Sequence, residues 1–459
     1  MTERHIVIIG GGFTGTALAI HLARLGDERL KVTVVEPRAQ LGQGVAYSTT
    51  DPAHRINVPA ARMQLSAAEE GDFARWYQQS GAEKQDAAAC WHDGKVYPQR
   101  AWFGAYVAEK FYQAAQSGVR LEHCQDRAVA LRDGRVTTAS GKILRADDVV
   151  LAISHPPPAV PHLVQQALTG HPGLIANPWH PQAPEAINAN DRVAIVGTGL
   201  TMADMVASLS ARGHHGPVTA FSRRGQLPRD NVSGDYAPRL LDYRQAPLTA
   251  HGWLRRVRQE VTQAAAENQP WQLVLDDIRA HAQQIWQRLP LREQRRFLRH
   301  LRSWWDVHRY RIAPQVSQAL QAWQHSGQLR VLAARLVAVE AQGRQIVLRL
   351  RPRKGPETSL IVDKLLITTG PAHNALLTSD ALLNQLAGEK IIQADPLALG
   401  ILVDAQSRTV NHQGEANPHL YVVGPAARGR FGELMGLPQV AEHAEAVARH
   451  LTGAAPLTP

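Results

Sequence analysis

The sequence predicts an α/β protein with two Rossmann-like dinucleotide-binding domains and a helical insertion. Two segments each resemble a buried strand, a glycine-rich turn and a helix rich in alanine and leucine. They are HIVIIGGGFTGTALAIHLARL near the start and RVAIVGTGLTMADMVASLSARG from Arg192. Each is followed by another apolar strand, KVTVVEP or PVTAFSRRG. Each segment therefore predicts a βαβ unit, in which a helix joins two parallel strands.

Composition and charge narrow the protein class. The chain has 459 residues, of which 44% are hydrophobic and 20% charged, as expected for a globular protein of two or more domains. Its two cysteines, Cys90 and Cys124, are far apart and form no CxxC, so we expect neither a disulfide framework, a redox dithiol nor a metal site. The start lacks a basic segment followed by a long apolar run, which predicts a cytoplasmic protein without a membrane span. The net charge of +10 favours an anionic cofactor or substrate over nucleic acid, because the arginines are mostly dispersed.

The order of apolar runs predicts three parts. Residues 1–160 would form the first part of one dinucleotide domain, and residues 361–459 would return to complete it. Residues 161–360 would form the second domain, with a glycine-poor helical insertion at about 248–324 followed by a β-meander. The runs DDVVLAISHPPP, VDKLLITTGP and HLYVVGPA predict strands that end at Pro or Gly. The last segment, LPQVAEHAEAVARHLTG, predicts an amphipathic helix ending at Gly453.

The first glycine turn has a complete dinucleotide fingerprint. Gly10, Gly12 and Gly15 form GxGxxG directly after the first strand. The first glycine permits the tight turn, the second lets pyrophosphate approach the backbone, and the third permits close helix packing. Glu36 ends the next strand, where a carboxylate accepts hydrogen bonds from ribose hydroxyls. We therefore assign the first domain to FAD.

The second turn departs from this fingerprint. Gly197 and Gly199 are present, but Met202 stands where the third glycine belongs, so we expect looser helix packing. No acid follows the next strand, which ends in Ser222, Arg223 and Arg224. Arginine can pair with the 2′-phosphate that a carboxylate would repel, so we predict NADPH as second cofactor, with NADH as the alternative. The competing interpretation is two solvated arginines on a turn.

Several segments together resemble a known family. They are the run from Gly42 to Met63, GTGLTMAD, FSRRGQLPR, WWDVHRYRIAP and the terminal GP…LPQ set. This combination resembles the YdhS-like FAD/NAD(P)-binding proteins, a family that includes FAD-dependent urate hydroxylases. More distantly, it is similar to the flavin monooxygenases and the N-hydroxylating enzymes. The resemblance implies cofactor contacts at Gly44, Gly424 and Pro438. The chain departs from related flavoproteins at Pro425, where many have an aspartate, and in the strand LAISHPPP.

Candidate catalytic residues come from two regions. In two-dinucleotide flavoproteins the segment NVPAARM runs under the isoalloxazine, so Arg62 and Gln64 are candidates to contact flavin or substrate. The alternative is a cofactor-covering loop without chemistry. His54 and His155 are acid–base candidates by residue type, although each is more simply a loop histidine.

The second region is a basic helix with interleaved aromatic residues. Five arginines recur at three- and four-residue spacing: Arg292, Arg295, Arg296, Arg299 and Arg302. They predict a solvated basic face opposite an aromatic core face. Arg309 and Arg311 are candidates to line an anion-accepting cleft, and Arg309 is our third catalytic candidate. Trp304, Trp305 and Tyr310 would provide a flat stacking surface beside them.

These observations predict an oxidoreductase with FAD and NADPH as cofactors and O2 and a small molecule as partners. The leading hypothesis is a monooxygenase that hydroxylates a small planar polar or anionic molecule, with urate as the first candidate. A monooxygenase relies on its cofactor for the oxygen chemistry, which explains why no triad, metal cluster or carboxylate pair is evident. The alternatives are an NAD(P)H dehydrogenase or reductase, an N-hydroxylating monooxygenase, and a non-catalytic flavin-binding sensor.

Overall fold

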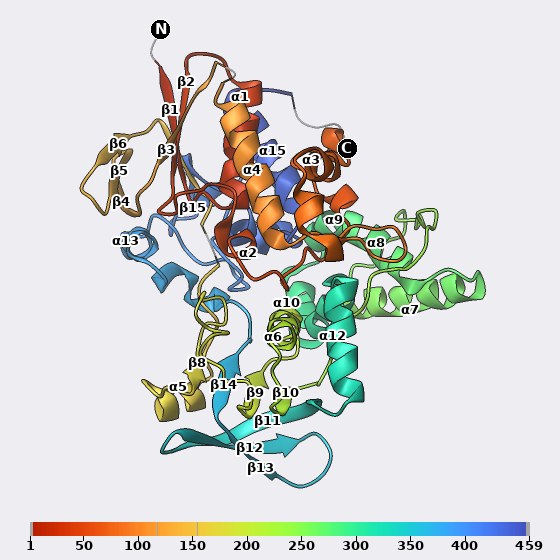
Figure 1. Cartoon of the computed structure of the whole chain (residues 1–459). Coiled ribbons are helices and arrows are strands. Elements are labelled where there is room, and N and C mark those ends of the chain that lie inside the picture. The colour runs from red at the N-terminus through yellow and green to blue at the C-terminus, as the bar shows by residue number, and fades with distance from the viewer. Residues whose placement is uncertain (1–2, 117, 154, 456–459) are drawn as a thin grey trace.

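The first sheet combines strands from both ends of the chain. The computed structural model describes residues 3–116, 118–153 and 155–455. Six strands have the order β15-β16-β7-β1-β2-β3 in the upper part of Figure 1. Their bounds are β1 (Arg4–Ile9), β2 (Leu30–Val35), β3 (Arg120–Cys124), β7 (Asp148–Leu151), β15 (Arg408–Val410) and β16 (Ala416–Val422). All neighbouring pairs are parallel except β15 and β16.

The central strand β1 is apolar because both of its faces are covered. Ile6 and Ile8 pack on one face with Leu18 of α1, whereas Val7 and Ile9 pack on the other. The first face is covered by α1 (Phe13–Leu25), α4 (Arg100–Ala114) and α15 (Gln439–Thr452) (Figure 1). The second face is covered by α13 (Ala381–Gly388) and by a three-stranded sheet of β4 (Ala128–Arg132), β5 (Arg135–Thr138) and β6 (Ile143–Arg145). Helix α15 ends at Gly453 in the left-handed conformation, a common helix stop, as the sequence predicted.

The second sheet lies in the lower part of Figure 1 and has the order β13-β12-β11-β10-β9-β14-β8. Its strands are β8 (Leu174–Ile175), β9 (Val193–Val196), β10 (Val218–Ser222), β11 (Leu329–Gln342), β12 (Gln345–Pro352), β13 (Thr358–Val362) and β14 (Lys364–Ile367). Strand β11 begins parallel to β10 and then pairs antiparallel with β12, which forms the predicted meander. Because β14 belongs to this sheet, the second unit extends beyond the expected boundary at residue 360.

The helical segment between β10 and β11 has two different roles. Helix α12 (Pro314–His325) packs against α6 (Leu200–Ala211) and connects two parallel strands, so it is the crossover helix of the second unit. The insertion proper comprises α7 (Ala250–Ala266), α8 (Trp271–Ala280), α9 (Ala282–Arg288), α10 (Leu291–His300) and α11 (Arg302–Arg309). The insertion thus ends before residue 324, because the last helix of the predicted segment packs on the second sheet.

The remaining described helices are short. They are α2 (Gly44–Tyr47), α3 (Asp72–Gln79), α5 (His162–Leu168), α14 (Arg428–Phe431), and the 3₁₀ turns η1 (Ala60–Arg62), η2 (Ala67–Glu69), η3 (Ala82–Gln85), η4 (Ala87–Ala89), η5 (His373–Thr378) and η6 (Pro425–Ala427). Within the described part of the chain, no helix combines the length and apolar character that a membrane crossing requires.

Candidate functional site

The first glycine turn is packed too closely for side chains. Gly10 has φ +106°, and a Cβ there would lie 2.3 Å from the carbonyl oxygen of Ala152. A Cβ on Gly15 would lie 1.9 Å from the carbonyl oxygen of Gly10, so this glycine lets α1 approach the turn. Gly12 caps α1, and a Cβ there would lie 3.3 Å from Cα of Gly44. Gly12 and Gly44 therefore form a backbone surface without side chains at the N-terminus of α1.

Glu36 lies beside this turn at the end of β2. Its side chain is buried, and its Oε2 accepts a 2.9 Å hydrogen bond from the N–H of Gly11. Its Oε1 accepts from the backbone and side chain of Arg38, both at 3.1 Å. The carboxylate is thus fixed at the position from which an adenosine ribose is recognised in this fold.

The C-terminal segment packs directly onto the first turn. Gly424 has φ +82°, and a Cβ there would lie 2.7 Å from the Thr14 side chain. The N–H of Gly424 donates to Nδ1 of His443, and Nε2 of His443 bonds to the Ser407 hydroxyl. Burial lowers the pKa of His443 to about 4, so its ring is a neutral acceptor toward Gly424. Pro438 caps the N-terminus of α15, which lies alongside α1 (Figure 1).

The second glycine turn leaves room for a phosphate. Gly197 has φ +118°, and a Cβ there would lie 2.5 Å from Oγ1 of Thr368. A Cβ on Gly199, by contrast, would have no described atom of the protein within 4 Å. Met202 is fully buried among residues of β9 and β10, so its side chain fills the space at the missing third glycine. The N-terminus of α6 therefore opens onto free space, as anion binding at a helix start requires.

Ser222, which ends β10, and the two arginines that follow it have different environments. The Ser222 hydroxyl accepts from the N–H of Gly225 and bonds to the Thr198 hydroxyl, which stabilises the turn. The guanidinium of Arg224 lies 5.4 Å from the ring centroid of Trp304 and donates to the His300 carbonyl. Arg223 is exposed, and among the described residues it makes no hydrogen bond or ion pair.

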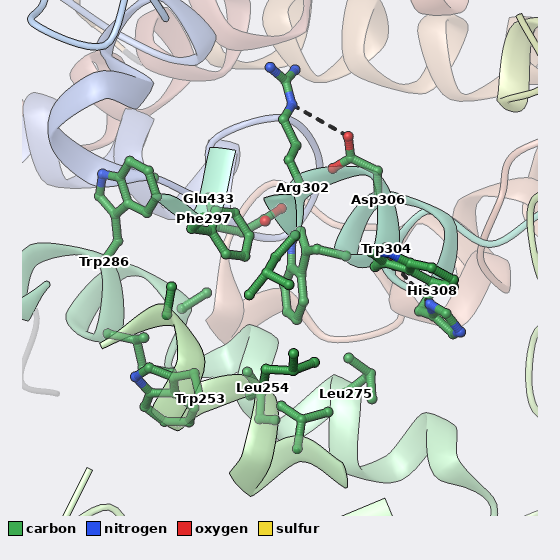
Figure 2. A pocket seen from close by; sticks show the side chains of 18 of the residues that line it. Trp253, Leu254, Leu275, Trp286, Phe297, Arg302, Trp304, Asp306, His308 and Glu433 are labelled. Atoms are coloured by element: carbon green, nitrogen blue, oxygen red, sulfur yellow. Dashed lines mark hydrogen bonds and ion pairs between the residues drawn. The ribbon is translucent and has the colours of Figure 1, made fainter. Parts of the chain in front are cut away.

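The insertion lines most of a partly open cavity of about 740 Å³ (Figure 2). Helices α7 and α8 form one wall, with Trp253, Leu254 and Leu275, and α9–α11 form the opposite wall. Arg428, Gly432, Glu433 and Met435 close one end of the cavity. These residues lie between Gly424, which contacts the first turn, and Pro438, which starts α15. The cavity is therefore bounded by the segment that joins the two C-terminal contacts of the predicted FAD site.

Charged groups concentrate at this end of the cavity. Nε of Arg309 donates to Glu433 at 2.5 Å, and the Arg309 guanidinium lies 4.2 Å from the ring centroid of Tyr310. Nε of Arg302 lies 3.4 Å from a carboxylate oxygen of Asp306, the ion pair drawn in Figure 2. Desolvation raises the pKa of Asp306 and raises that of Tyr310 to about 12.

The structure corrects the expectation that Arg309 and Arg311 receive an anion. Arg309 is buried against Glu433, and Arg311 is buried against Asp276 of α8. Each arginine is already neutralised by a carboxylate, so the pair provides no free positive site. Trp304, Trp305 and Tyr310 do line the cavity, but Arg309 covers one face of the tyrosine ring.

The two loop candidates, Arg62 and Gln64, differ in burial and in partners. Arg62 is exposed, and its guanidinium lies 3.9 Å from the Asp276 carboxylate. The Oε1 atom of Gln64 is buried and has no hydrogen-bond partner among the described residues. A buried acceptor without a donor is unfavourable, so Gln64 is the stronger candidate for a cofactor or substrate contact.

A histidine pair at the two connections between the sheets was not predicted as a unit. His155 follows β7 and His373 follows β14, and their ring centroids are 5.6 Å apart. Nη1 of Arg428 lies 3.3 Å from Nε2 of His373. Desolvation and, second, the Arg428 charge lower the pKa of His155 to about 4 and that of His373 to about 3. Sequence analysis flagged only His155, because the pair forms between segments more than 200 residues apart.

His54, the other histidine candidate, has a structural role. Its Nδ1 bonds to the Thr49 hydroxyl and its Nε2 to the hydroxyl of Ser208 on α6. The ring therefore joins the first unit to the second and carries no free nitrogen for acid–base chemistry.

The part of the cavity lining that α7, α8 and α9 contribute was also missed. Its apolar residues include Trp253, Leu254, Leu275, Ile278 and Trp286. The available signal was the amphipathic pattern of these helices, which does not distinguish a cavity wall from a packed core.

Comparisons with known proteins agree with the predicted fold. Residues 7–156 match the family described as FAD-NAD(P)-binding, which covers the first unit as far as the first connection. No curated protein matches the sequence. These findings support the FAD-NAD(P)-binding class, whereas the narrower YdhS-like resemblance gains no support from them.

Three solved structures resemble the chain over almost its whole length. Reduced ornithine hydroxylase from Pseudomonas aeruginosa is 16% identical, with 99% of each chain covered and a TM-score of 0.62. L-lysine 6-monooxygenase from Pseudomonas syringae is 16% identical, with 98% of each chain covered and a TM-score of 0.61. Ornithine N-hydroxylase from Kutzneria sp. 744 is 17% identical, with 98% of this chain and 99% of that chain covered and a TM-score of 0.60. The α/β fold with two dinucleotide-binding units is thereby confirmed.

Proposed function

We propose that this protein is an FAD-dependent, NADPH-using monooxygenase that hydroxylates the nitrogen of an amine bound in the cavity. One observation carries this proposal. The cavity is bounded by the segment 428–435 of the first unit and by Trp304, which Arg224 of the second unit contacts. A substrate there would lie next to elements of both dinucleotide units, as an oxygenation that uses both cofactors requires.

The residues of the first unit fit FAD. The Gly12–Gly44 surface and the N-terminus of α1 would hold the pyrophosphate, and Glu36 would accept from the ribose. The unpaired Oε1 of Gln64 would accept from a donor on the flavin or substrate. When bound, FAD supplies the redox chemistry that passes electrons from NADPH to O2. The chain's own contribution is to position the substrate, hold the reacting nitrogen and exclude water.

The second unit fits a phosphorylated nicotinamide dinucleotide. The open space at Gly199 would receive the pyrophosphate. Arg223 would pair with the 2′-phosphate, because its guanidinium is exposed and makes no bond within the described residues. Arg224 is already held against Trp304 and a backbone carbonyl, so it contributes less.

Nitrogen hydroxylation explains the site better than urate hydroxylation. The argument for a planar anion depended on Arg309 and Arg311, which are both paired with carboxylates. The structural neighbours include ornithine hydroxylases and an L-lysine 6-monooxygenase, and the Kutzneria structure contains reduced FAD, NADP+ and L-ornithine. Their shared fold supports the reaction class and leaves the substrate to be decided by the residues of this cavity.

The test uses purified protein with its bound flavin. We expect non-covalent FAD and NADPH oxidation that consumes O2. With a substrate amine present, we expect a hydroxylamine containing one oxygen atom from labelled O2. Rapid anaerobic NADPH oxidation with a quinone acceptor, without an oxygenated product from any amine, would instead establish the reductase alternative. Protein that binds FAD but does not oxidise NADPH would establish the sensor alternative.

A further inference from the structure

The cavity is lined mainly by aromatic and aliphatic side chains. Its aromatic residues come from all five inserted helices and the end of α11: Trp253, Trp271, Trp286, Phe297, Trp304, Trp305 and Tyr310. Its volume of about 740 Å³ lies within the roughly 300–1,000 Å³ typical of pockets for drug-sized ligands. Such a lining favours a substrate with a large apolar or aromatic body, and it offers few hydrogen bonds to a flexible polar chain.

The charges of the cavity disfavour a cationic guest. Four arginines line it, Arg229, Arg258, Arg302 and Arg428, against two carboxylates, Asp306 and Glu433. Both carboxylates are already engaged, Asp306 with Arg302 and Glu433 with Arg309. An ammonium group would therefore meet an excess of positive charge and no free counter-ion.

We propose that the substrate is an aromatic amine with an extended apolar body, uncharged at neutral pH. This inference rests on the proposed function, because it identifies the substrate class of the same cavity. An aromatic amine keeps the free lone pair that nitrogen hydroxylation requires, and its body matches the aromatic walls. Its N–H groups can donate to a lone pair that the arginine contacts leave on Asp306 or Glu433, although the negative charge of each carboxylate is already balanced.

The reaction balances with the two co-substrates of the proposed function. One oxygen atom of O2 forms the new N–O bond as the O–O bond breaks, and the other leaves as water. NADPH supplies a hydride and solvent supplies one proton. Aromatic amine, O2, NADPH and a proton thus give the aryl hydroxylamine, NADP+ and water.

The experiment compares amines by calorimetry and by product analysis. The probes are para-hexylaniline, which is uncharged at neutral pH, para-hexylbenzylamine, which has nearly the same body but is an ammonium, unsubstituted aniline and L-ornithine. We expect para-hexylaniline to bind at least about tenfold more tightly than each of the others. Tighter binding of para-hexylbenzylamine or ornithine would overturn the assignment, and so would equal binding of aniline.

Two variants test whether the cavity is the binding site. Leu254→Trp should fill the cavity and weaken para-hexylaniline binding at least about tenfold, with FAD content retained. Val257→Phe, from the same wall, serves if that protein does not fold. The matched control is Leu240→Trp, at a leucine that is 82% exposed, and it should bind normally. Equal loss in the control, or no loss in either cavity variant, would overturn the proposal.

A charge variant tests the selection of the amine group. Arg302→Gln removes one lining cation and frees Asp306, so the preference for para-hexylaniline over para-hexylbenzylamine should fall at least about tenfold. An unchanged preference would contradict the electrostatic argument.

The two proposals fail differently. Binding of para-hexylaniline without hydroxylamine would overturn the proposed function, whereas hydroxylation of ornithine without para-hexylaniline binding would overturn only the substrate class.

Discussion

Arg223 and Arg224 are adjacent in sequence, yet the structure predicts different effects on cofactor choice. Arg223 is exposed and makes no bond within the described residues, whereas Arg224 packs on Trp304 and bonds to the His300 carbonyl. A hydrogen bond to a charged group contributes about 1.5–3 kcal/mol. At about 1.4 kcal/mol per factor of ten, Arg223→Ala should lower kcat/KM for NADPH roughly tenfold to a hundredfold. The value for NADH should be unchanged, because NADH lacks the 2′-phosphate.

Steady-state NAD(P)H oxidation by the wild type and two variants is the assay. The wild type should prefer NADPH by at least about tenfold. Arg224→Ala should retain most of this preference, because Arg224 contacts Trp304 of the protein and not the cofactor. An exposed cation–π contact of this kind contributes only about 0.5–1 kcal/mol. Arg223→Lys keeps the charge and should retain part of the preference. An equal loss with both cofactors in Arg223→Ala, or a larger loss of preference in Arg224→Ala, would refute the assignment.

Three further predictions concern the first unit. Gly12→Val should yield protein without FAD, because the added methyl groups would overlap Gly44. Flavin absorbance per chain measures this, and a normal FAD content would contradict the assignment of the first glycine turn to FAD. His443→Asn, whose amide oxygen can replace the ring acceptor, should flatten the pH dependence of thermal stability. The wild-type ring has its pKa lowered to about 4, so the unfolded chain binds more protons below about pH 6.5, and stability of about 3 kcal/mol is lost as pH falls from 6.5 to 4. An identical pH profile in the variant would assign the loss to other groups. Asp86→Ala leaves the buried Arg55 without its carboxylate, so the free energy of unfolding should fall by about 3–5 kcal/mol and the thermal midpoint should drop. Asp242→Ala removes the partner of Arg244 in an exposed pair and should change the midpoint little. Similar midpoints in the two variants would contradict this difference.

The sequence was sufficient to predict the elements that depend on local backbone geometry. The turns at Gly10 and Gly197 each follow a buried strand and precede a helix, and each glycine has a positive φ that other residues rarely adopt. The stop of α15 at Gly453 follows from the same property. Such features are determined within a few residues, so the local sequence is enough to identify them.

The sequence was not sufficient to predict which charges remain free. Arg309 pairs with Glu433, 124 residues away, and Arg311 pairs with Asp276, 35 residues away. No local pattern indicates these partners, so two neutralised arginines resembled an anion site. The extent of the insertion was mispredicted for a related reason, because α12 packs with α6 and the second sheet, whereas Trp305 of α11 packs with α7 and α8.

The relative orientation of the two units is fixed by buried polar contacts on α6. Arg100 of α4 pairs with Asp204 of α6 at 2.9 Å, and both side chains are buried. One turn farther along α6, the Ser208 hydroxyl bonds to His54 of the first unit. Removing one partner of a buried charge pair costs about 3–5 kcal/mol, so rotating α6 away from the first unit would be similarly unfavourable. Because the second glycine turn lies at the N-terminus of α6, a nucleotide bound there is held in one orientation toward the first unit. A nucleotide at this turn would therefore face the first unit without a rotation of one unit against the other.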